Sequence, residues 1–216
     1  MSKVQSLKEY IHLIRHLREY KALFFRGGVL NEIGWMRSRK ENAIVDKSGM
    51  PIPWYTYPAI SFLESKNLTN LRVFEWGSGY STIYFAKRAG SVVAVEHDSK
   101  WYSMIKKNIE KYRNINYLFR ESTKEYLNAV EEQGVKYSII VVDGVNRDGC
   151  MEKAVESLAK DGILILDDSE RKEYDKMKEF LLNKGFKSLD FWGMAASICY
   201  LKCTSVFYRD RNVFDI

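Results

Sequence analysis

From about residue 71 onward, the chain alternates short apolar runs with segments of helical periodicity. The apolar runs predict seven strands. They are LRVFEW (71–76), SVVAVE (91–96), INYLFR (115–120), YSIIVVD (137–143), GILILDD (162–168), FKSLDF (186–191) and TSVFYR (204–209). Between them we expect helices that begin near Ser81, Ser99, Ser122, Asp148 and Glu170. This alternation is typical of an α/β domain with a mostly parallel seven-stranded sheet and helices on both faces.

The residues before the first strand follow a different pattern. Apolar side chains recur at helical spacing near the amino end, at Val4, Leu7, Ile11, Ile14 and Leu17. They predict an amphipathic helix over about residues 3–24 that packs one face on the domain. Glycines and prolines from Gly27 to Pro58 then predict a loop. We expect one domain over residues 1–216, with residues 1–68 as a helical, lid-like extension and residues 69–216 as the α/β core.

A glycine turn follows the first predicted strand and leads directly into a helix, in the segment Glu75-Trp76-Gly77-Ser78-Gly79-Tyr80-Ser81-Thr82. Gly77 and Gly79 allow a ligand to approach the main chain and the helix amino terminus closely. A dinucleotide site would have a third glycine where this chain has Thr82. Glu75 would repel a pyrophosphate but suits a cationic ligand. The turn therefore favours a sulfonium nucleoside over a nicotinamide cofactor.

An acid before such a glycine turn resembles the first motif of class I methyltransferases, whose cofactor is S-adenosylmethionine. The resemblance implies a Rossmann-like class I methyltransferase fold, with cofactor contacts at Glu75, Gly77, Ser78, Gly79, Tyr80, Ser81 and Asp143. Glu96 ends the second strand, like the family's second motif, where a carboxylate accepts hydrogen bonds from both ribose hydroxyls. His97 would lie against the adenine, or is a surface histidine. Ser122 would hold the adenine edge, or caps the next helix.

Three aspartates, Asp143, Asp167 and Asp168, follow the fourth and fifth predicted strands. The carboxyl ends of parallel strands share one crevice, so these carboxylates should converge and would repel each other without a cation. A magnesium-like ion suits oxygen ligands and lowers the pKa of an acceptor hydroxyl. The arrangement resembles metal-dependent O-methyltransferases, and its order D…D-D is that of the macrolide sugar O-methyltransferases rather than the D…D-N of the catechol branch. We therefore expect these three residues as Mg²⁺ ligands and Asp143 as the catalytic residue. Alternatively, Asp143 only contacts the cofactor and Asp168 caps a helix.

Contacts with the methyl acceptor are expected from two segments. PIPWYTYP (51–58) concentrates Trp54, Tyr55 and Tyr57, whose rings would wall the acceptor pocket, although such a cluster is also typical of a core. Arg147 would hold an anionic or hydroxyl-rich acceptor. The catechol branch has a lysine base where this chain has Asn146, so the sequence names no general base. PIPWYTYPAI, FEWGSGYST and CTSVFYR are also similar to a family of uncharacterised bacterial methyltransferases.

The charge and the cysteine content of the chain exclude only a few classes of protein. The formal charge of +6 raises the question of an anionic partner, but the basic residues near the amino end are more typical of a solvated helix face. The three cysteines lack disulfide or zinc spacing, and no stretch resembles a signal peptide or a membrane span. We expect a cytoplasmic protein. The amino-terminal helix could equally make a homodimer contact.

These patterns together predict an S-adenosylmethionine-dependent, Mg²⁺-assisted O-methyltransferase that acts on a small hydroxylated molecule, such as a sugar or a secondary metabolite. A nucleic-acid methyltransferase is a first alternative, favoured by the basic charge. It is disfavoured because the fourth strand lacks the N/D-P-P-Y/F motif and no RNA-binding module is visible. A non-catalytic cofactor-binding module is a second alternative, since a fold does not guarantee chemistry.

Overall fold

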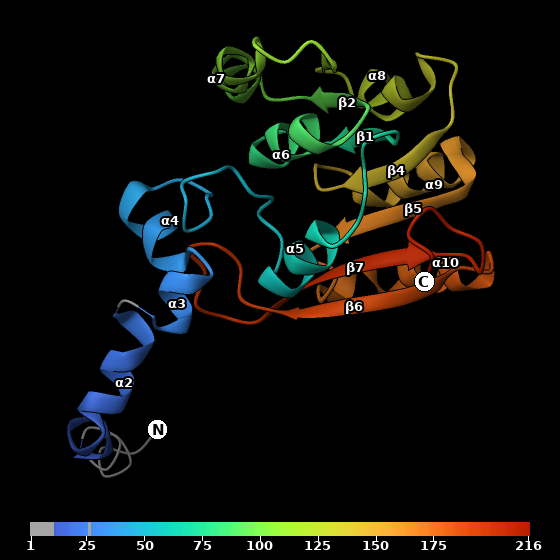
Figure 1. Cartoon of the computed structure of the whole chain (residues 1–216). Coiled ribbons are helices and arrows are strands. Elements are labelled where there is room, and N and C mark those ends of the chain that lie inside the picture. The colour runs from blue at the N-terminus through green and yellow to red at the C-terminus, as the bar shows by residue number, and fades with distance from the viewer. Residues whose placement is uncertain (1–10, 26) are drawn as a thin grey trace.

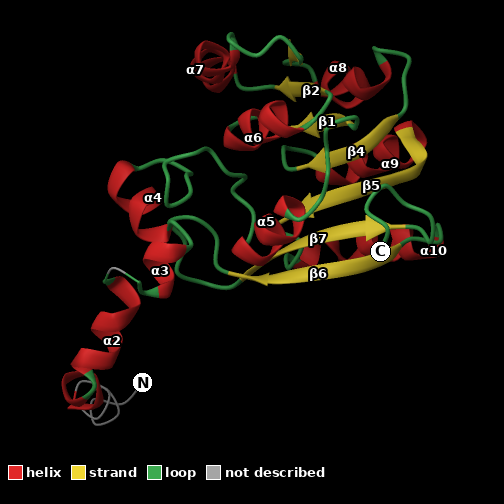
Figure 2. Ribbon diagram, viewed as in Figure 1, coloured by secondary structure: helices red, strands yellow, loops and turns green. Residues whose placement is uncertain are grey.

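The structure is a computed structural model that describes residues 11–25 and 27–216. Seven strands form one sheet in the order β3-β2-β1-β4-β5-β7-β6 (Figures 1 and 2). Their bounds are β1 Arg72–Trp76, β2 Ser91–Glu96, β3 Ile115–Phe119, β4 Tyr137–Val142, β5 Leu158–Asp167, β6 Lys187–Gly193 and β7 Lys202–Tyr208. Strands β1 to β5 pair in parallel, whereas β7 is antiparallel to β5 and β6. The predicted mostly parallel sheet is confirmed.

Helices cover both faces of this sheet. After β1 they are α6 Tyr80–Arg88, α7 Ser99–Ile109, α8 Thr123–Asn128, α9 Arg147–Ser157 and α10 Asp175–Asn183, with short 3₁₀ helices at Ala129–Glu131 and Lys172–Tyr174. Four of the five predicted helix starts lie within one residue of the observed ones. The fifth, near Glu170, precedes a 3₁₀ helix, and α10 begins only at Asp175.

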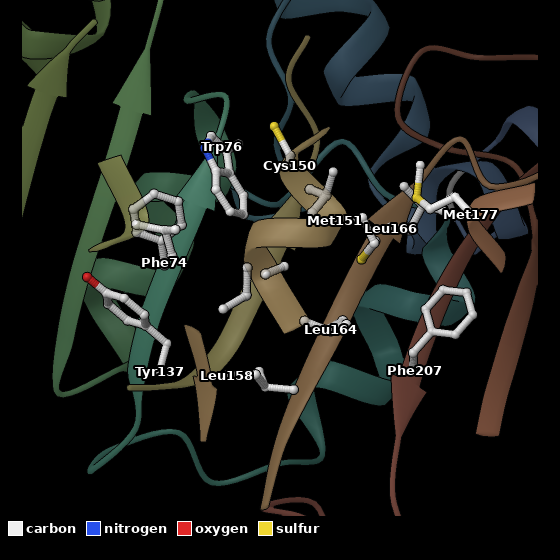
Figure 3. Close-up of a cluster of buried hydrophobic side chains, with 14 of the residues drawn as sticks. Phe74, Trp76, Tyr137, Cys150, Met151, Leu158, Leu164, Leu166, Met177 and Phe207 are labelled. Atoms are coloured by element: carbon white, nitrogen blue, oxygen red, sulfur yellow. The ribbon is translucent and has the colours of Figure 1, made fainter. Parts of the chain in front are cut away.

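The core has two main parts, one on each face, because successive strand residues point to opposite faces of the sheet. On one face, Phe74, Trp76 and their neighbours pack against side chains of α8, α9 and α10, such as Met151 and Met177 (Figure 3). On the other face, residues such as Val73 pack against α6 and against α5 Tyr57–Glu64. Burial on both faces explains why the parallel strands read as nearly continuous apolar runs.

The predicted loop from Gly27 to Pro58 is only partly a loop. It contains α3 Val29–Glu32 and α4 Trp35–Glu41, and α5 begins at Tyr57. The sequence signals misled here because glycine and proline also delimit helices. Gly34 precedes α4 with φ +84°, and Pro58 stands in the first turn of α5, where a missing N–H costs nothing.

The amino-terminal helix differs from expectation in its packing. Residues 11–15 are helical, α2 Leu17–Phe24 follows after a break at His16, and positions 3–10 lie outside the described residues. The side chains are not covered by the domain, since Ile14 is 69% and Phe25 61% exposed. Figure 1 shows α2 pointing away from the sheet. For residues 11–25, the expectation that this helix packs one face on the domain is therefore wrong.

Residues 42–57, which we call the strap, lie across the loop between β6 and β7. The indole N–H of Trp54 donates to the carbonyl of Ala196 at 2.8 Å. Thr56 forms an isolated bridge with Ala195, and its N–H donates to Thr204 Oγ1 at 3.1 Å. Because the β6–β7 loop lies at the carboxyl end of β6, the strap runs along the same edge of the sheet as the glycine turn. Within the two described ranges, no helix is long and apolar enough to cross a membrane.

Candidate cofactor and acceptor site

The ends of β1 and β4 meet in the middle of the sheet, where the strand order changes direction. Gly77 has φ +88°, and a Cβ there would lie 2.8 Å from the carbonyl oxygen of Asp143. The N–H of Asp143 donates to the carbonyl of Trp76 at 3.1 Å. Both the positive φ and the close approach require glycine at position 77. Ligands of open α/β sheets bind in the crevice outside such a switch point.

Glu75 is fully buried behind the turn, with an exposed fraction of 0%. Its Oε2 accepts a 2.6 Å hydrogen bond from Thr82 Oγ1, and this hydroxyl oxygen accepts one of 3.0 Å from the N–H of Gly79. Thr82 therefore links the acid to the turn, which gives a physical reason for the missing third glycine. No described residue hydrogen-bonds Glu75 Oε1. Burial raises the pKa of Glu75 to about 7, although the Ser81 and Thr82 hydroxyls lower it.

A cavity of about 380 Å³ opens beside the turn. Its walls come from the turn, the strap, α7 and the β6–β7 loop, and its lining residues are Asn42, Ala43, Ile44, Trp54, Ser78, Gly79, Tyr80, Ser81, Trp101, Asp143 and Ser197. A Cβ at Gly79 would meet only Trp101 Cζ2, at 3.6 Å. The backbone of Gly79 is therefore open to a ligand, and the cavity has the size of a small-molecule site.

Trp101 was not predicted as a site residue. Its indole N–H donates to the carbonyl of Ser78 at 2.7 Å, so its ring lies over the glycine turn. The sequence signal for it was indirect. Asp98 has the residue type of a helix cap just before α7, and its carboxylate accepts from the N–H of Trp101 at 2.8 Å. This cap fixes the first turn of α7 and, with it, the position of the indole ring.

Glu96 ends β2 next to the turn and is 4% exposed. Its Oε1 accepts from the N–H groups of His97 at 2.9 Å and Asp98 at 3.0 Å. Its Oε2 accepts a 2.8 Å hydrogen bond from Ser78 Oγ, which also lies 2.7 Å from the Tyr117 hydroxyl. The carboxylate is therefore held in place by two backbone donors and the Ser78 hydroxyl, and its contact with a ribose stays a prediction.

The two residues expected at the adenine do not line this cavity. His97 is half exposed, and its ring meets that of Tyr126 edge-on with centroids 5.7 Å apart. Ser122 has the geometry of a helix cap, because its Oγ accepts from the N–H of Glu125 at 3.3 Å and donates to its carboxylate at 2.8 Å. Their contacts with adenine remain predictions.

The three aspartates converge, but two cations of the chain itself lie between them. Lys202, only 3% exposed, places its Nζ 2.5 Å from Asp167 Oδ2 and 2.7 Å from Asp168 Oδ1. Arg147 Nη2 donates to Asp143 Oδ1 at 3.0 Å and lies 3.6 Å from Asp168 Oδ2. In residues 11–25 and 27–216, no group of three or more His, Cys, Asp or Glu side chains could hold a metal ion.

The predicted Mg²⁺ therefore does not fit the side chains present, because nitrogen atoms occupy the space between the carboxylates and neutralise their charge. Although burial lowers the pKa of Lys202, Asp167 and Asp168 outweigh it and raise the pKa above its usual value. Burial would raise the pKa of Asp168, but Lys202 and Arg147 hold it below its usual value. Lys202 and Arg147 thus pair with all three aspartates, although burial raises the pKa values of Asp143 and Asp167. No pattern in the sequence singles out Lys202.

Arg147 faces the protein rather than the cavity. It is 9% exposed, its Nε donates to the carbonyl of Gly144 at 3.0 Å, and its Nη1 donates to the carbonyl of Asp167. This geometry fits a role in holding the segment after β4. The contact of Arg147 with the acceptor stays a prediction. For this contact to form, the guanidinium would have to give up one of its hydrogen bonds within the protein.

The three aromatic residues of the strap take different places. Trp54 lines the cavity and is 49% exposed. Tyr55 is fully buried, its hydroxyl has no partner among the described residues, and burial together with Glu75 and Asp143 raises its pKa well above the usual range. Tyr57 begins α5 and lines a separate cavity, between the strap and α5. Only Trp54 is placed to touch an acceptor in this cavity.

Left-handed backbone also gathers around the site. Non-glycine residues with positive φ include Asn42 at 50°, Asn146 at 49°, Asp168 at 53° and Ser197 at 62°. Asn42 and Ser197 line the cavity, while Asn146 and Asp168 follow β4 and β5. Asn and Asp tolerate this conformation, but at Ser197 it costs about 1–2 kcal/mol. Such strain is concentrated at functional sites in proteins.

Several solved structures share this architecture. An O-methyltransferase from Bacillus cereus gives a TM-score of 0.57 at 16% identity, over 70% of this chain and 78% of that one. Precorrin-6y C5,15-methyltransferase from Geobacter metallireducens GS-15 gives 0.55 at 13%, over 71% and 88%. An rRNA methylase from Streptococcus thermophilus gives 0.54 at 13%, over 70% and 96%. The chain has the Rossmann-like methyltransferase fold.

At such low identities the likeness shows the methyltransferase fold alone. Neither a scan against protein-family models nor a search of curated proteins found a match. The resemblance to a family of uncharacterised bacterial methyltransferases is therefore not confirmed. A shared fold does not set the activity, which depends on the residues of the site.

Proposed function

We propose that the cavity beside the turn binds S-adenosylmethionine, and that the protein transfers its methyl group to a hydroxyl of a small acceptor, such as a sugar or a secondary metabolite. The observation that carries this proposal is the buried Glu75 carboxyl, whose Oε1 lacks a partner among the described residues directly behind the turn. A buried carboxylate needs a hydrogen-bonded cation. The α-ammonium of S-adenosylmethionine would supply one.

Other residues fit the remaining parts of this cofactor. Glu96 is oriented by two backbone N–H groups and would accept hydrogen bonds from the ribose in place of the one from Ser78. Gly79 leaves open the space in which the ligand would approach the main chain. The ring of Trp101 would cover the bound molecule from the side of α7. The Bacillus O-methyltransferase of the same fold is in complex with S-adenosylhomocysteine.

Asp143 is the residue best placed to assist the reaction. Among the described residues that line the cavity, it alone has a carboxylate. Burial and the neighbouring Asp167 raise its pKa well above the usual range, although Arg147 and Lys202 lower it. A carboxylate with a raised pKa is a better general base. When bound, the cofactor supplies an electrophilic methyl carbon, and Asp143 would take the hydroxyl proton as the acceptor oxygen is methylated.

A methyl-transfer assay tests both parts of this proposal. The protein is incubated with S-adenosylmethionine labelled in its methyl group and a panel of sugars and phenols. We expect label in at least one acceptor, and an Asp143→Asn variant that still binds the cofactor but transfers at least about a hundredfold more slowly, as for loss of a general base. A transfer rate of Asp143→Asn equal to that of the wild type would exclude Asp143 as the general base. Cofactor binding without transfer to any acceptor would favour the non-catalytic module.

Methylation of RNA is the second candidate, because an rRNA methylase is among the similar structures and the formal charge is +6. The small cavity walled by the strap favours a small acceptor instead. Filter binding of RNA at about 50 mM and about 200 mM salt separates the two, because phosphate-driven binding weakens steeply over this range. Tight, salt-sensitive RNA binding would support the RNA candidate.

A further inference from the structure

Three oxygen atoms surround the Nζ of Lys202 between the ends of β5 and β7. They are Asp167 Oδ2 at 2.5 Å, Asp168 Oδ1 at 2.7 Å and the carbonyl oxygen of Trp54 at 3.1 Å. The ammonium group has three N–H donors, so these contacts satisfy all of them. A second hydrogen bond, from Thr204 Oγ1 at 2.6 Å, fixes the other oxygen of Asp167.

This oxygen set is the kind that hard divalent cations take in proteins. Two carboxylates and a main-chain carbonyl are typical Mg²⁺ and Ca²⁺ ligands, at about 2.1 Å and 2.3–2.6 Å respectively. A divalent ion cannot enter while the ammonium is there, because the two cations would compete for the same oxygens and repel each other. Lys202 and Arg147 also offset two of the three aspartate charges, so little negative charge is left to attract an ion.

We propose that Lys202 is the resident cation of this acidic cluster and takes the place of a divalent metal, so that the site is metal-independent and becomes a metal site only when Lys202 is removed. The claim that methyl transfer needs no metal rests on the proposed function. The occupancy of the cluster by Lys202 stands on the contacts alone.

Lys202 also connects the acidic cluster to the wall of the cavity. Its bond to the Trp54 carbonyl holds the strap, and the side chain of Trp54 lines the cavity. Asp168, its other partner, has φ +53°, so the ion pair also stabilises a left-handed turn after β5. Lys202 is therefore a positioning residue. It orients groups around the acceptor without reaching the cavity itself.

The test is Mn²⁺ binding, followed by the loss of the free Mn²⁺ signal in electron paramagnetic resonance as MnCl₂ is added without any cofactor. We expect no binding by the wild type and none by Lys202→Arg, which keeps the cation. Lys202→Ala should bind Mn²⁺ with a dissociation constant at least tenfold below the highest MnCl₂ concentration at which the wild type shows no binding. The matched control is Lys187→Ala, which removes an exposed lysine paired with Asp210 and should behave as the wild type.

Two results would overturn the proposal. One is Mn²⁺ binding by the wild type that disappears in Asp168→Asn, and the other is a folded Lys202→Ala variant that binds no better than the wild type. If Lys202→Ala does not fold, Lys202→Met, which removes the charge but keeps most of the side chain, takes its place in the titration. All of these titrations are made without S-adenosylmethionine, so their outcome does not depend on the proposed function. If the proposed function is wrong, a separate titration with S-adenosylmethionine would show no binding.

Discussion

Glu75 ties the stability of the chain to ligand binding. Its pKa of about 7 lies above the ordinary value of 4.5, because burial disfavours the carboxylate. The unfolded chain ionises this group from about pH 4.5 upward, but the folded chain does so only near pH 7. Stability is therefore lost as the pH rises through this window, by about 3 kcal/mol at most, and the loss is complete above pH 7.

The variant Glu75→Gln should accordingly be more stable and less functional. At pH 8 we expect its free energy of unfolding to rise by about 1–3 kcal/mol, because no buried charge remains, and its affinity for S-adenosylmethionine to fall at least tenfold. Urea denaturation and calorimetry measure the two effects. The exposed Glu64→Gln is the control and should change neither. Lower stability together with undiminished binding would contradict the role given to Glu75.

The same carboxyl predicts how binding depends on pH. A cationic ligand requires ionised Glu75, and with a pKa of about 7 the ionised fraction grows about 15-fold between pH 5.5 and pH 7. The affinity for S-adenosylmethionine should rise by about that factor, with release of a proton on binding near pH 6. Calorimetry in two buffers of different ionisation enthalpy measures this proton. Affinity independent of pH in this window would mean that another group receives the ammonium.

At the scale of elements, the two glycines of the turn between β1 and α6 have different roles, because Gly77 is needed for the fold and Gly79 for ligand binding. Gly77→Ala forces a Cβ to 2.8 Å from the Asp143 carbonyl at φ +88°, and should destabilise the fold by about 2 kcal/mol or more. Gly79→Ala meets only Trp101 at 3.6 Å, so the melting temperature should hold while cofactor binding weakens at least tenfold. Thermal denaturation and calorimetry compare the pair. Full binding by a well-folded Gly79→Ala would show that the ligand does not lie on this turn.

The elements also show what a sequence can predict here. Parallel strands buried on both faces read as apolar runs, and capping residues mark the helix starts, so the sheet and the turn follow from local signals. The place of Lys202 does not follow from local signals. Lys202 lies near Asp167 because β7 pairs antiparallel with β5, with Thr204 opposite Asp167. No local pattern encodes that register. Trp101 was hidden for a similar reason, since its hydrogen bond to the carbonyl of Ser78 joins two different elements.

At the scale of the whole molecule, the amino-terminal helix contributes little to the stability of the domain. Because Ile14 and Leu17 are 69% and 46% exposed, we expect the double variant Ile14→Ser, Leu17→Ser to unfold within about 0.5 kcal/mol of the wild type. Chemical denaturation measures this. A larger loss would mean that the apolar face is covered in solution, and analytical ultracentrifugation of the same variant would then test the predicted homodimer.

The central claim is that the cavity beside the turn is an S-adenosylmethionine site. Calorimetric titration of S-adenosylmethionine into the wild type and into Glu96→Gln tests it most directly. We predict one site per chain in the wild type and at least tenfold weaker binding in Glu96→Gln, because the ribose loses its acceptor. No heat of binding in the wild type, or equal affinity in both proteins, would contradict the claim.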